Sequence, residues 1–209
     1  MSHVVLLGDS VFDNASYVPG QAPVIEQLRR ALPGGWQATL LAIDGDVTTG
    51  VAEQLDDLPR DATHLVVSVG GNDALQHSFI VHEAAGSVAD VLGRLADIQA
   101  NFRRQYRRML DTVLARELPA IVCTVYDAIP GLEPPLLAAL SLFNDVIAHE
   151  AFRAGIPVID LRLVCTEAAD YSPLSPIEPS HAGGLKIARA IAAALATHDF
   201  TAGRSCVYC

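Results

Sequence analysis

Three stretches of the sequence carry residue types that nucleophilic catalysis uses. Ser10 comes directly after the first apolar run of the chain, Asn72 follows two glycines after another such run, and Glu178 precedes His181 by three residues. A serine hydroxyl becomes a nucleophile when a histidine takes its proton, and a carboxylate that accepts the Nδ1 proton leaves Nε2 facing the serine. A fixed, uncharged amide such as that of Asn72 can stabilise the oxyanion that forms. Together the stretches predict acyl transfer by a serine.

Each stretch also has a plainer interpretation when it is taken alone. Gly-Asp-Ser at 8–10 is typical of a turn that caps a helix, and Asp-Gly-Asp at 44–46 is typical of an ordinary turn. The glycines before Asn72 can belong to a capped loop, and a single histidine is more often structural than catalytic. We favour the catalytic interpretation because His181 has a carboxylate at short range and a serine at a neighbouring predicted strand end.

The elements that must position these residues alternate between short apolar, β-branched runs and longer helical patterns. The short runs lack an alternating polar face, as expected for strands that are buried on both sides. The predicted strands are His3–Leu7, Thr39–Ile43, His64–Val69, Ala120–Val125 and Pro157–Leu161. The predicted helices are Ala22–Leu32, Val47–Leu58, Ser87–Arg116, Pro134–Ala154 and Ala182–Ala196. The segment Ala74–Gly86 has no strong periodicity and is a candidate cover for the site.

Five strands joined by helical crossovers predict an α/β protein with a three-layer α/β/α, flavodoxin-like domain around a parallel sheet. The natural strand order is 2-1-3-4-5, and ligands bind at the carboxyl ends of the strands, where this order reverses. Ser10, the stretch at 44–46 and Asn72 all follow the ends of predicted strands. We therefore expect these residues to meet at one edge of the sheet.

Length and composition are those of one globular domain. The chain has 209 residues, 51% of them hydrophobic, and a formal net charge of −10. This charge disfavours nucleic acid as a partner, because phosphates are bound mainly by Lys and Arg. We expect a catalytic domain at 1–200 and a loosely ordered tail at 201–209, with Cys206 and Cys209 as reducible thiols. The sequence shows no targeting or membrane-spanning segment, which favours a cytoplasmic protein.

Taken in order, the motifs resemble those of the SGNH hydrolases, the family of GDSL-type esterases and lipases. The resemblance rests on Gly-Asp-Ser ending at Ser10, Gly45 after the second strand, Gly-x-Asn-Asp around Asn72, and acid-x-x-His ending at His181. It implies the SGNH hydrolase fold over nearly the whole chain, with Ser10 as nucleophile and, through its N–H, as oxyanion donor. The N–H of Gly45 and the side chain of Asn72 would complete the oxyanion hole. His181 would be the general base, oriented by Glu178.

The sequence departs from the family pattern at three positions. Glu178 stands where aspartate is usual, Asp44 stands where asparagine is common before the glycine, and Ala182 follows the histidine where proline is frequent. Glutamate serves in other serine triads, so the first change is tolerable. Asp9 and Asp170 are the rival candidates for the acid, although neither lies three residues from the histidine.

The predicted function is hydrolysis of a small-molecule carboxylic ester through an acyl-enzyme, which needs no metal and no organic cofactor. The same site would serve an acyltransferase or a thioesterase, since the triad does not determine the acceptor. A third hypothesis is a flavodoxin-like module that binds a small anion or nucleotide without chemistry. The chain has no GxGxxG or P-loop pattern, which disfavours that module. The sequence does not determine the acyl length, the alcohol or the oligomeric state.

Overall fold

The computed structural model describes residues 2–209, which form a parallel sheet with helices on both faces. The sheet order is β2-β1-β3-β4-β5-β6, and each neighbouring pair runs in parallel. The strands are β1 (His3–Gly8), β2 (Gln37–Leu40), β3 (His64–Ser68), β4 (Ala120–Cys123), β5 (Val158–Ile159) and β6 (Val207–Tyr208). The predicted order 2-1-3-4-5 is confirmed for the first five strands, so the carboxyl ends of β1 and β3 lie side by side.

The sixth strand corrects the prediction of a loosely ordered tail at 201–209. Val158 donates its N–H to the Cys206 carbonyl at 2.9 Å, and Asp160 donates to the Tyr208 carbonyl at 2.8 Å. The tail therefore covers the edge of β5 that a five-stranded sheet would leave unpaired. A strand of two residues is too short to show a periodicity, which is why the sequence pattern did not reveal it.

The helices fall where the predicted crossovers lie. They are α1 (Val24–Ala31), α2 (Val51–Gln54), α3 (Gly71–Leu75), α4 (Val88–Leu114), α5 (Pro134–Ala154), α6 (Leu161–Val164) and α7 (His181–Thr197), with 3-10 turns η1 (Ala15–Tyr17), η2 (Leu55–Asp57), η3 (Ser78–His82) and η4 (Ala168–Asp170). The single helix predicted over Val47–Leu58 is replaced by two short pieces, α2 and η2. Helix α5 begins with a proline in its first turn and ends at Gly155, whose φ is 68°, as these residue types favour.

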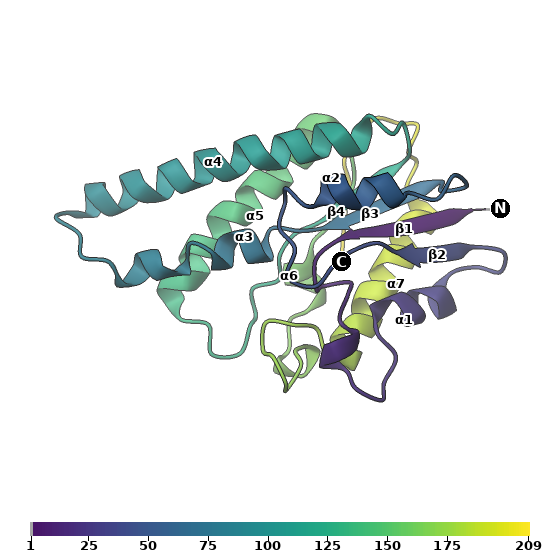
Figure 1. Ribbon diagram of the computed structural model, residues 1–209, viewed down its shortest axis with the longest axis horizontal. Coiled ribbons are helices and arrows are strands. Elements are labelled where there is room, and N and C mark those ends of the chain that lie inside the picture. The colour runs from purple at the N-terminus through teal and green to yellow at the C-terminus, as the bar shows by residue number, and fades with distance from the viewer. Residues whose placement is uncertain (1) are drawn as a thin grey trace.

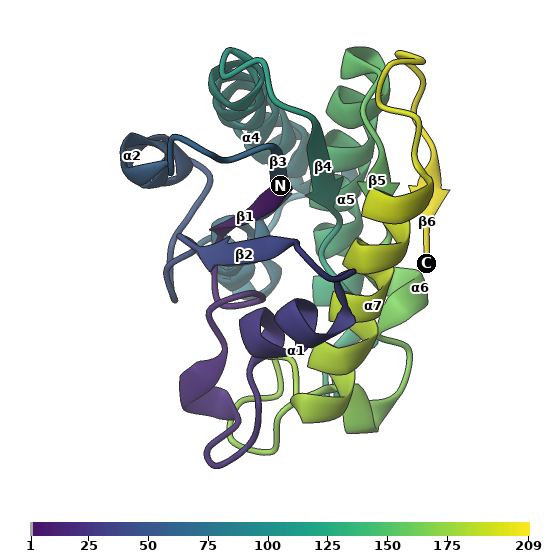
Figure 2. The same ribbon diagram turned by 90° about the vertical axis from the view of Figure 1, so that its right-hand side faces the viewer.

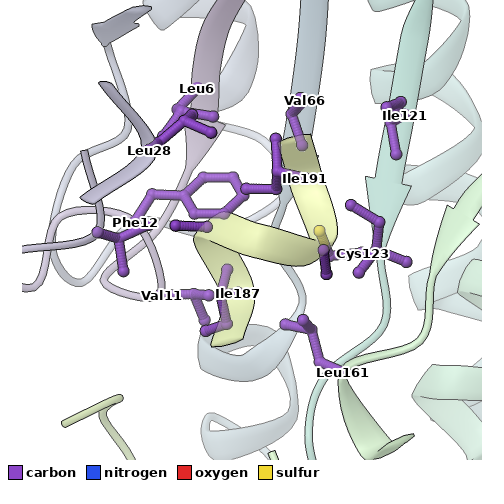
Figure 3. Packing of buried hydrophobic residues seen from close by; sticks show 14 of the residues in the cluster. Leu6, Val11, Phe12, Leu28, Val66, Ile121, Cys123, Leu161, Ile187 and Ile191 are labelled. Atoms are coloured by element: carbon purple, nitrogen blue, oxygen red, sulfur yellow. The ribbon is translucent and has the colours of Figure 1, made fainter. Parts of the chain in front are cut away.

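Two hydrophobic cores hold the three layers together. Alternate strand residues point to opposite faces, so Leu6 packs in one core and Leu7 in the other. The first core joins the sheet to α1 and α7, and Figure 3 shows Leu28 of α1 and Ile191 of α7 meeting the sheet there. The second core joins the sheet to α2, α4 and α5, which lie on the opposite face from α1 and α7 (Figure 2).

The helices α4 and α5 are long, with 27 and 21 residues respectively. They pack against one another and extend together beyond the sheet (Figure 1). The segment from α3 through η3 to the start of α4 runs along the protruding part and contacts α5. This protrusion stands at the end of the sheet where the loops after β1 and β3 emerge. Within residues 2–209, no helix combines the length and the apolar character that crossing a membrane requires.

Candidate active site

Ser10 lies in a tight turn at the carboxyl end of β1. The N–H groups of Phe12 and Asp13 donate to the Asp9 carbonyl at 3.1 and 3.2 Å, which closes the turn around Ser10. Before the turn, Gly8 has a φ of 123° and lies so close to the Ser68 carbonyl that any Cβ would overlap that oxygen. Only glycine allows β1 and β3 to approach this closely where Ser10 begins. The side chain of Ser10 is buried, with 6% of the residue exposed.

The Gln54 side chain ties the end of β1 to the loop after β2. Its Oε1 accepts from the Gly8 N–H at 2.7 Å, and its Nε2 donates to the Gly8 carbonyl at 2.8 Å. The same Nε2 donates to Asp46 Oδ2 at 2.7 Å. Gln54 thus fixes the backbone next to the serine. No sequence pattern indicated this role, because a polar residue in a short amphipathic segment does not reveal which group it will bind.

Asn72 lies in the first turn of α3, where its side chain faces the loop after β2. Its Nδ2 donates to the Asp46 carbonyl at 2.8 Å. Because an amide NH2 has two hydrogens, the second remains available to an oxyanion. The next residue, Asp73, accepts from both the N–H and the hydroxyl of Thr48, each at 3.0 Å. Asn72 therefore lines the same pocket as Ser10 on a firmly held edge.

Gly45 is the one predicted oxyanion donor that does not line this pocket. It is exposed, has a φ of 82° and is not among the residues that line the pocket of Ser10. Asp44, the residue where the family commonly has asparagine, accepts a hydrogen bond from the Tyr17 hydroxyl at 2.9 Å, and its N–H donates to Asp13. These contacts hold the loop after β2 against the loop that follows Ser10.

Glu178 lies directly beside Ser10, on the loop between η4 and α7. Its backbone N–H donates to the Ser175 carbonyl at 3.0 Å, and its own carbonyl accepts from the Ser172 N–H at 2.8 Å. The Tyr126 hydroxyl donates to the neighbouring Ile177 carbonyl at 2.6 Å. So held, the Glu178 carboxyl lines the same pocket as Ser10, and the Ser10 side chain acts on its pKa.

His181 does not take the place that was predicted for it. Ser180 caps α7, so His181 is the first residue of the helix. Its Nδ1 lies 2.8 Å from the Gln27 amide nitrogen and 3.2 Å from the Ala22 carbonyl. The predicted hydrogen bond from Nδ1 to Glu178 is therefore wrong, and His181 is not among the residues that line the pocket. The helix start turns residue 181 towards α1, whereas residue 178 still belongs to the loop that faces Ser10.

The two rival acids also have definite places. Asp170 is buried at the start of the loop that carries Glu178, where its Oδ2 pairs with the Lys186 ammonium at 2.8 Å. It faces α7 and does not line the pocket. Asp9 does line the pocket, but its Oδ1 accepts from the Val11 N–H at 3.1 Å and so stabilises the nucleophile turn.

Burial dominates the electrostatics of this pocket. It raises the pKa of Glu178 to about 7, while the hydrogen bond with Ser10 lowers the value and the charge of Asp44 raises it. Burial likewise raises the pKa of Asp9 well above its ordinary range, offset in part by the hydrogen bond from Val11. A carboxylate without a countercharge in an apolar site favours its neutral form. The site therefore holds two acids whose proton affinities are unusually high.

The pocket beside Ser10 is mainly apolar beyond the polar cluster. It extends between α3, η3, α4 and α5, in the part of the molecule that protrudes past the sheet. Side chains of the predicted cover segment form one wall, with α4 and α5 opposite. The apolar lining includes Leu75, Ile80, Ile98, Leu132, Leu140 and Phe143. The helical pattern of α4 and α5 alone gave no signal of this wall, because apolar residues at helical spacing look the same whether they line a core or a pocket.

The fold agrees with solved structures of enzymes that cleave esters. The lipase Lip_vut3 from a goat rumen metagenome matches with a TM-score of 0.72 and 19% identity, over 93% of this chain and 97% of that one. The acetyl xylan esterase AlAXEase matches with a TM-score of 0.66 and 15% identity, over 94% of this chain and 100% of that one. Phospholipase A1 from Streptomyces albidoflavus NA297 matches with a TM-score of 0.62 and 18% identity, over 95% and 99%. A comparison with curated protein sequences finds no match.

The layered α/β/α sheet has the SGNH hydrolase fold, and together with the family match it defines the class of the protein, a hydrolase that acts on ester bonds. The chain belongs to the GDSL-like lipase/acylhydrolase family, whose model matches residues 6–184. The resemblance inferred from the motifs is thereby confirmed. The match includes the turn of Ser10, the loop of Asn72 and the whole loop that carries Glu178.

Proposed function

We propose that the protein hydrolyses carboxylic esters through an acyl-enzyme formed on Ser10, with the acyl group in the apolar pocket. The observation that carries this proposal is the position of Ser10, which lies where a buried polar edge meets an apolar pocket. A carbonyl carbon placed above the Ser10 hydroxyl would have its oxygen near the Asn72 amide. The acyl chain would then extend between α4 and α5.

The chemistry takes place in two acyl-transfer steps. The Ser10 oxygen attacks the ester carbonyl, and the negative charge that develops on the carbonyl oxygen is stabilised by the free Asn72 amide hydrogen and by the Ser10 N–H. Among the described residues, the Ser10 N–H has no hydrogen-bond partner, so it is available for this role. Collapse of the intermediate releases the alcohol, and water then cleaves the acyl-serine.

The test is a hydrolysis panel of p-nitrophenyl esters from acetate to palmitate. We expect Ser10→Ala to lose activity by ~10⁴-fold or more, because the nucleophile and its base act as a unit. Ser78→Ala is the matched control, since Ser78 lies in the same pocket on η3. A fluorophosphonate should label the parent and Ser78→Ala proteins but not Ser10→Ala. Activity of Ser10→Ala within tenfold of the parent would contradict the proposal.

A further inference from the structure

The carboxyl group of Glu178 is the ionisable group that the structure places directly against the nucleophile. Both Ser10 and Glu178 line the pocket, where the Ser10 side chain acts on the Glu178 carboxyl and lowers its pKa against the effect of burial. The second carboxyl oxygen, Oε2, is buried and has no hydrogen-bond partner among residues 2–209. A buried carboxyl oxygen with no partner is costly to keep, and such groups concentrate at functional sites.

We propose that Glu178 is the general base that activates Ser10, so that a serine–glutamate pair replaces the serine–histidine–acid relay. This inference rests on the proposed ester hydrolysis. Its geometric basis is the placement of Glu178 against Ser10, together with the placement of His181 away from both.

His181 has a structural role in this arrangement. Its Nδ1 faces Gln27 of α1, and the Gln27 Nε2 also contacts the His181 carbonyl at 3.0 Å and the Ala22 carbonyl at 2.8 Å. Gln27 is itself buried. The histidine and the glutamine thus join the start of α7 to α1. Ser180, the residue that caps α7, separates His181 in the helix from Glu178 in the loop.

A second histidine, His77, is the rival base that must be tested. It lines the pocket at the end of α3, where its ring stacks near Phe143 with centroids 6.5 Å apart. No hydrogen bond joins His77 to Ser10 among the residues that the structure describes. The aromatic contact places His77 in the acyl-binding wall.

The surroundings of Glu178 suit a base that works near neutral pH. Burial raises the pKa of this carboxyl to about 7, the Ser10 hydroxyl lowers it, and Asp44 raises it. Glu178 in turn raises the pKa values of Asp9, Tyr17 and Tyr126, which are acids or phenols. A carboxylate with a raised pKa is a stronger base than an ordinary one, and general bases work best when their pKa lies near the operating pH.

The proton and the electrons balance over the cycle. In acylation, the Ser10 hydroxyl proton passes to the Glu178 carboxylate while the serine oxygen forms its bond to the ester carbon. The neutral Glu178 then gives that proton to the departing alkoxide as the carbon–oxygen bond breaks. In deacylation, Glu178 takes a proton from water as the water oxygen bonds to the acyl carbon. Glu178 then returns that proton to the Ser10 oxygen as the bond between the acyl carbon and this oxygen breaks, which releases the carboxylic acid.

The test compares four single variants with the parent enzyme on one p-nitrophenyl ester that the parent hydrolyses. We expect Glu178→Gln to lower kcat by ~10³-fold or more, while His181→Gln stays within tenfold. The parent, His181→Gln and His77→Gln should all show kcat/KM rising with pH through one ionisation near 7, because the base works in its deprotonated form. Glu178→Asp should keep partial activity with the same direction of pH dependence.

The temperature dependence of that ionisation separates the two kinds of base. A carboxyl pKa hardly changes on warming, whereas an imidazole pKa falls, so a temperature-invariant kinetic pKa supports Glu178. If His181→Gln or His77→Gln abolishes the ionisation and Glu178→Gln keeps it, the inference is overturned. Failure of the underlying function looks different, since Ser10→Ala would then stay active. Circular dichroism establishes that Glu178→Gln is folded.

Discussion

The Gln54 side chain pairs with both backbone groups of Gly8, accepting from its N–H at 2.7 Å and donating to its carbonyl at 2.8 Å. The Gln54 amide therefore binds Gly8 as the backbone of a neighbouring strand would, at the point where β1 ends and the turn of Ser10 begins. Because the third contact of Gln54 goes to Asp46, one side chain fixes the backbone before Ser10 relative to the loop on which Asn72 also rests. The position of the serine therefore depends on a residue that never touches it.

Replacing Gln54 by leucine should cost much of the stability of the fold. The change keeps the volume but leaves the buried Gly8 N–H unpaired and removes three hydrogen bonds, so we expect the free energy of unfolding to fall by ~3 kcal/mol. Urea denaturation measures this loss. Gln21→Ala is the control, because Gln21 is exposed and makes no side-chain hydrogen bond in the described part of the chain. Equal midpoints for Gln54→Leu and the parent would show that the pairing contributes nothing.

Gly8→Ala should be more damaging than any other glycine substitution near the site. The added Cβ would overlap the Ser68 carbonyl, and the φ of 123° is unfavourable for every residue with a side chain. We expect the variant to be insoluble or to lose its cooperative unfolding transition. Gly34→Ala, whose Cβ would meet no atom within 4 Å, should melt like the parent. A Gly8→Ala protein with parental melting behaviour would contradict the close approach of β1 and β3.

Asn72→Ala should lower kcat by ~10²-fold, equivalent to about 3 kcal/mol, while KM changes little. The reason is that an oxyanion donor acts mainly in the transition state, and Asn72 retains one free amide hydrogen beside the pocket. Asn101→Ala on the outer surface of α4 is the control. A raised KM with an intact kcat would instead make Asn72 a group that binds the ground state.

The sequence predicts the fold better than it predicts the relations between side chains. Strand periodicity and breakers depend on local residue types, and crossovers are right-handed in nearly all parallel sheets, so these signals were enough for the strand order. These local signals could not predict which side chain lies next to Ser10. Acid-x-x-His was interpreted as one unit, yet Ser180 is a helix cap that divides it, leaving Glu178 in the loop and His181 in the helix. One signal was present: the proline expected after the catalytic histidine follows Glu178 instead, at Pro179.

Glu178→Gln should make the folded protein more stable at pH 8 even as it removes activity. The folded-state pKa of Glu178 is about 7, against an ordinary value of 4.5. Between these two values the folded state binds more protons than the unfolded state, so stability falls as pH rises from about 4.5 to 7. Glutamine has no proton to lose and avoids this penalty. The variant should therefore have a higher Tm than the parent at pH 8, and the difference should vanish near pH 4.

Paired thermal melts at pH 4 and pH 8 measure this difference. In a domain of this size each kcal/mol corresponds to about 2–4 °C in Tm. Glu53→Gln is the control for the substitution itself, because Glu53 is exposed on α2. Asp9 and Asp73 also have raised pKa values, but they are present in every protein compared and do not enter the difference. If the parent and Glu178→Gln melt alike at both pH values, the Glu178 carboxylate is hydrated in the folded state, and it would then lack the raised basicity that suits it to activate Ser10.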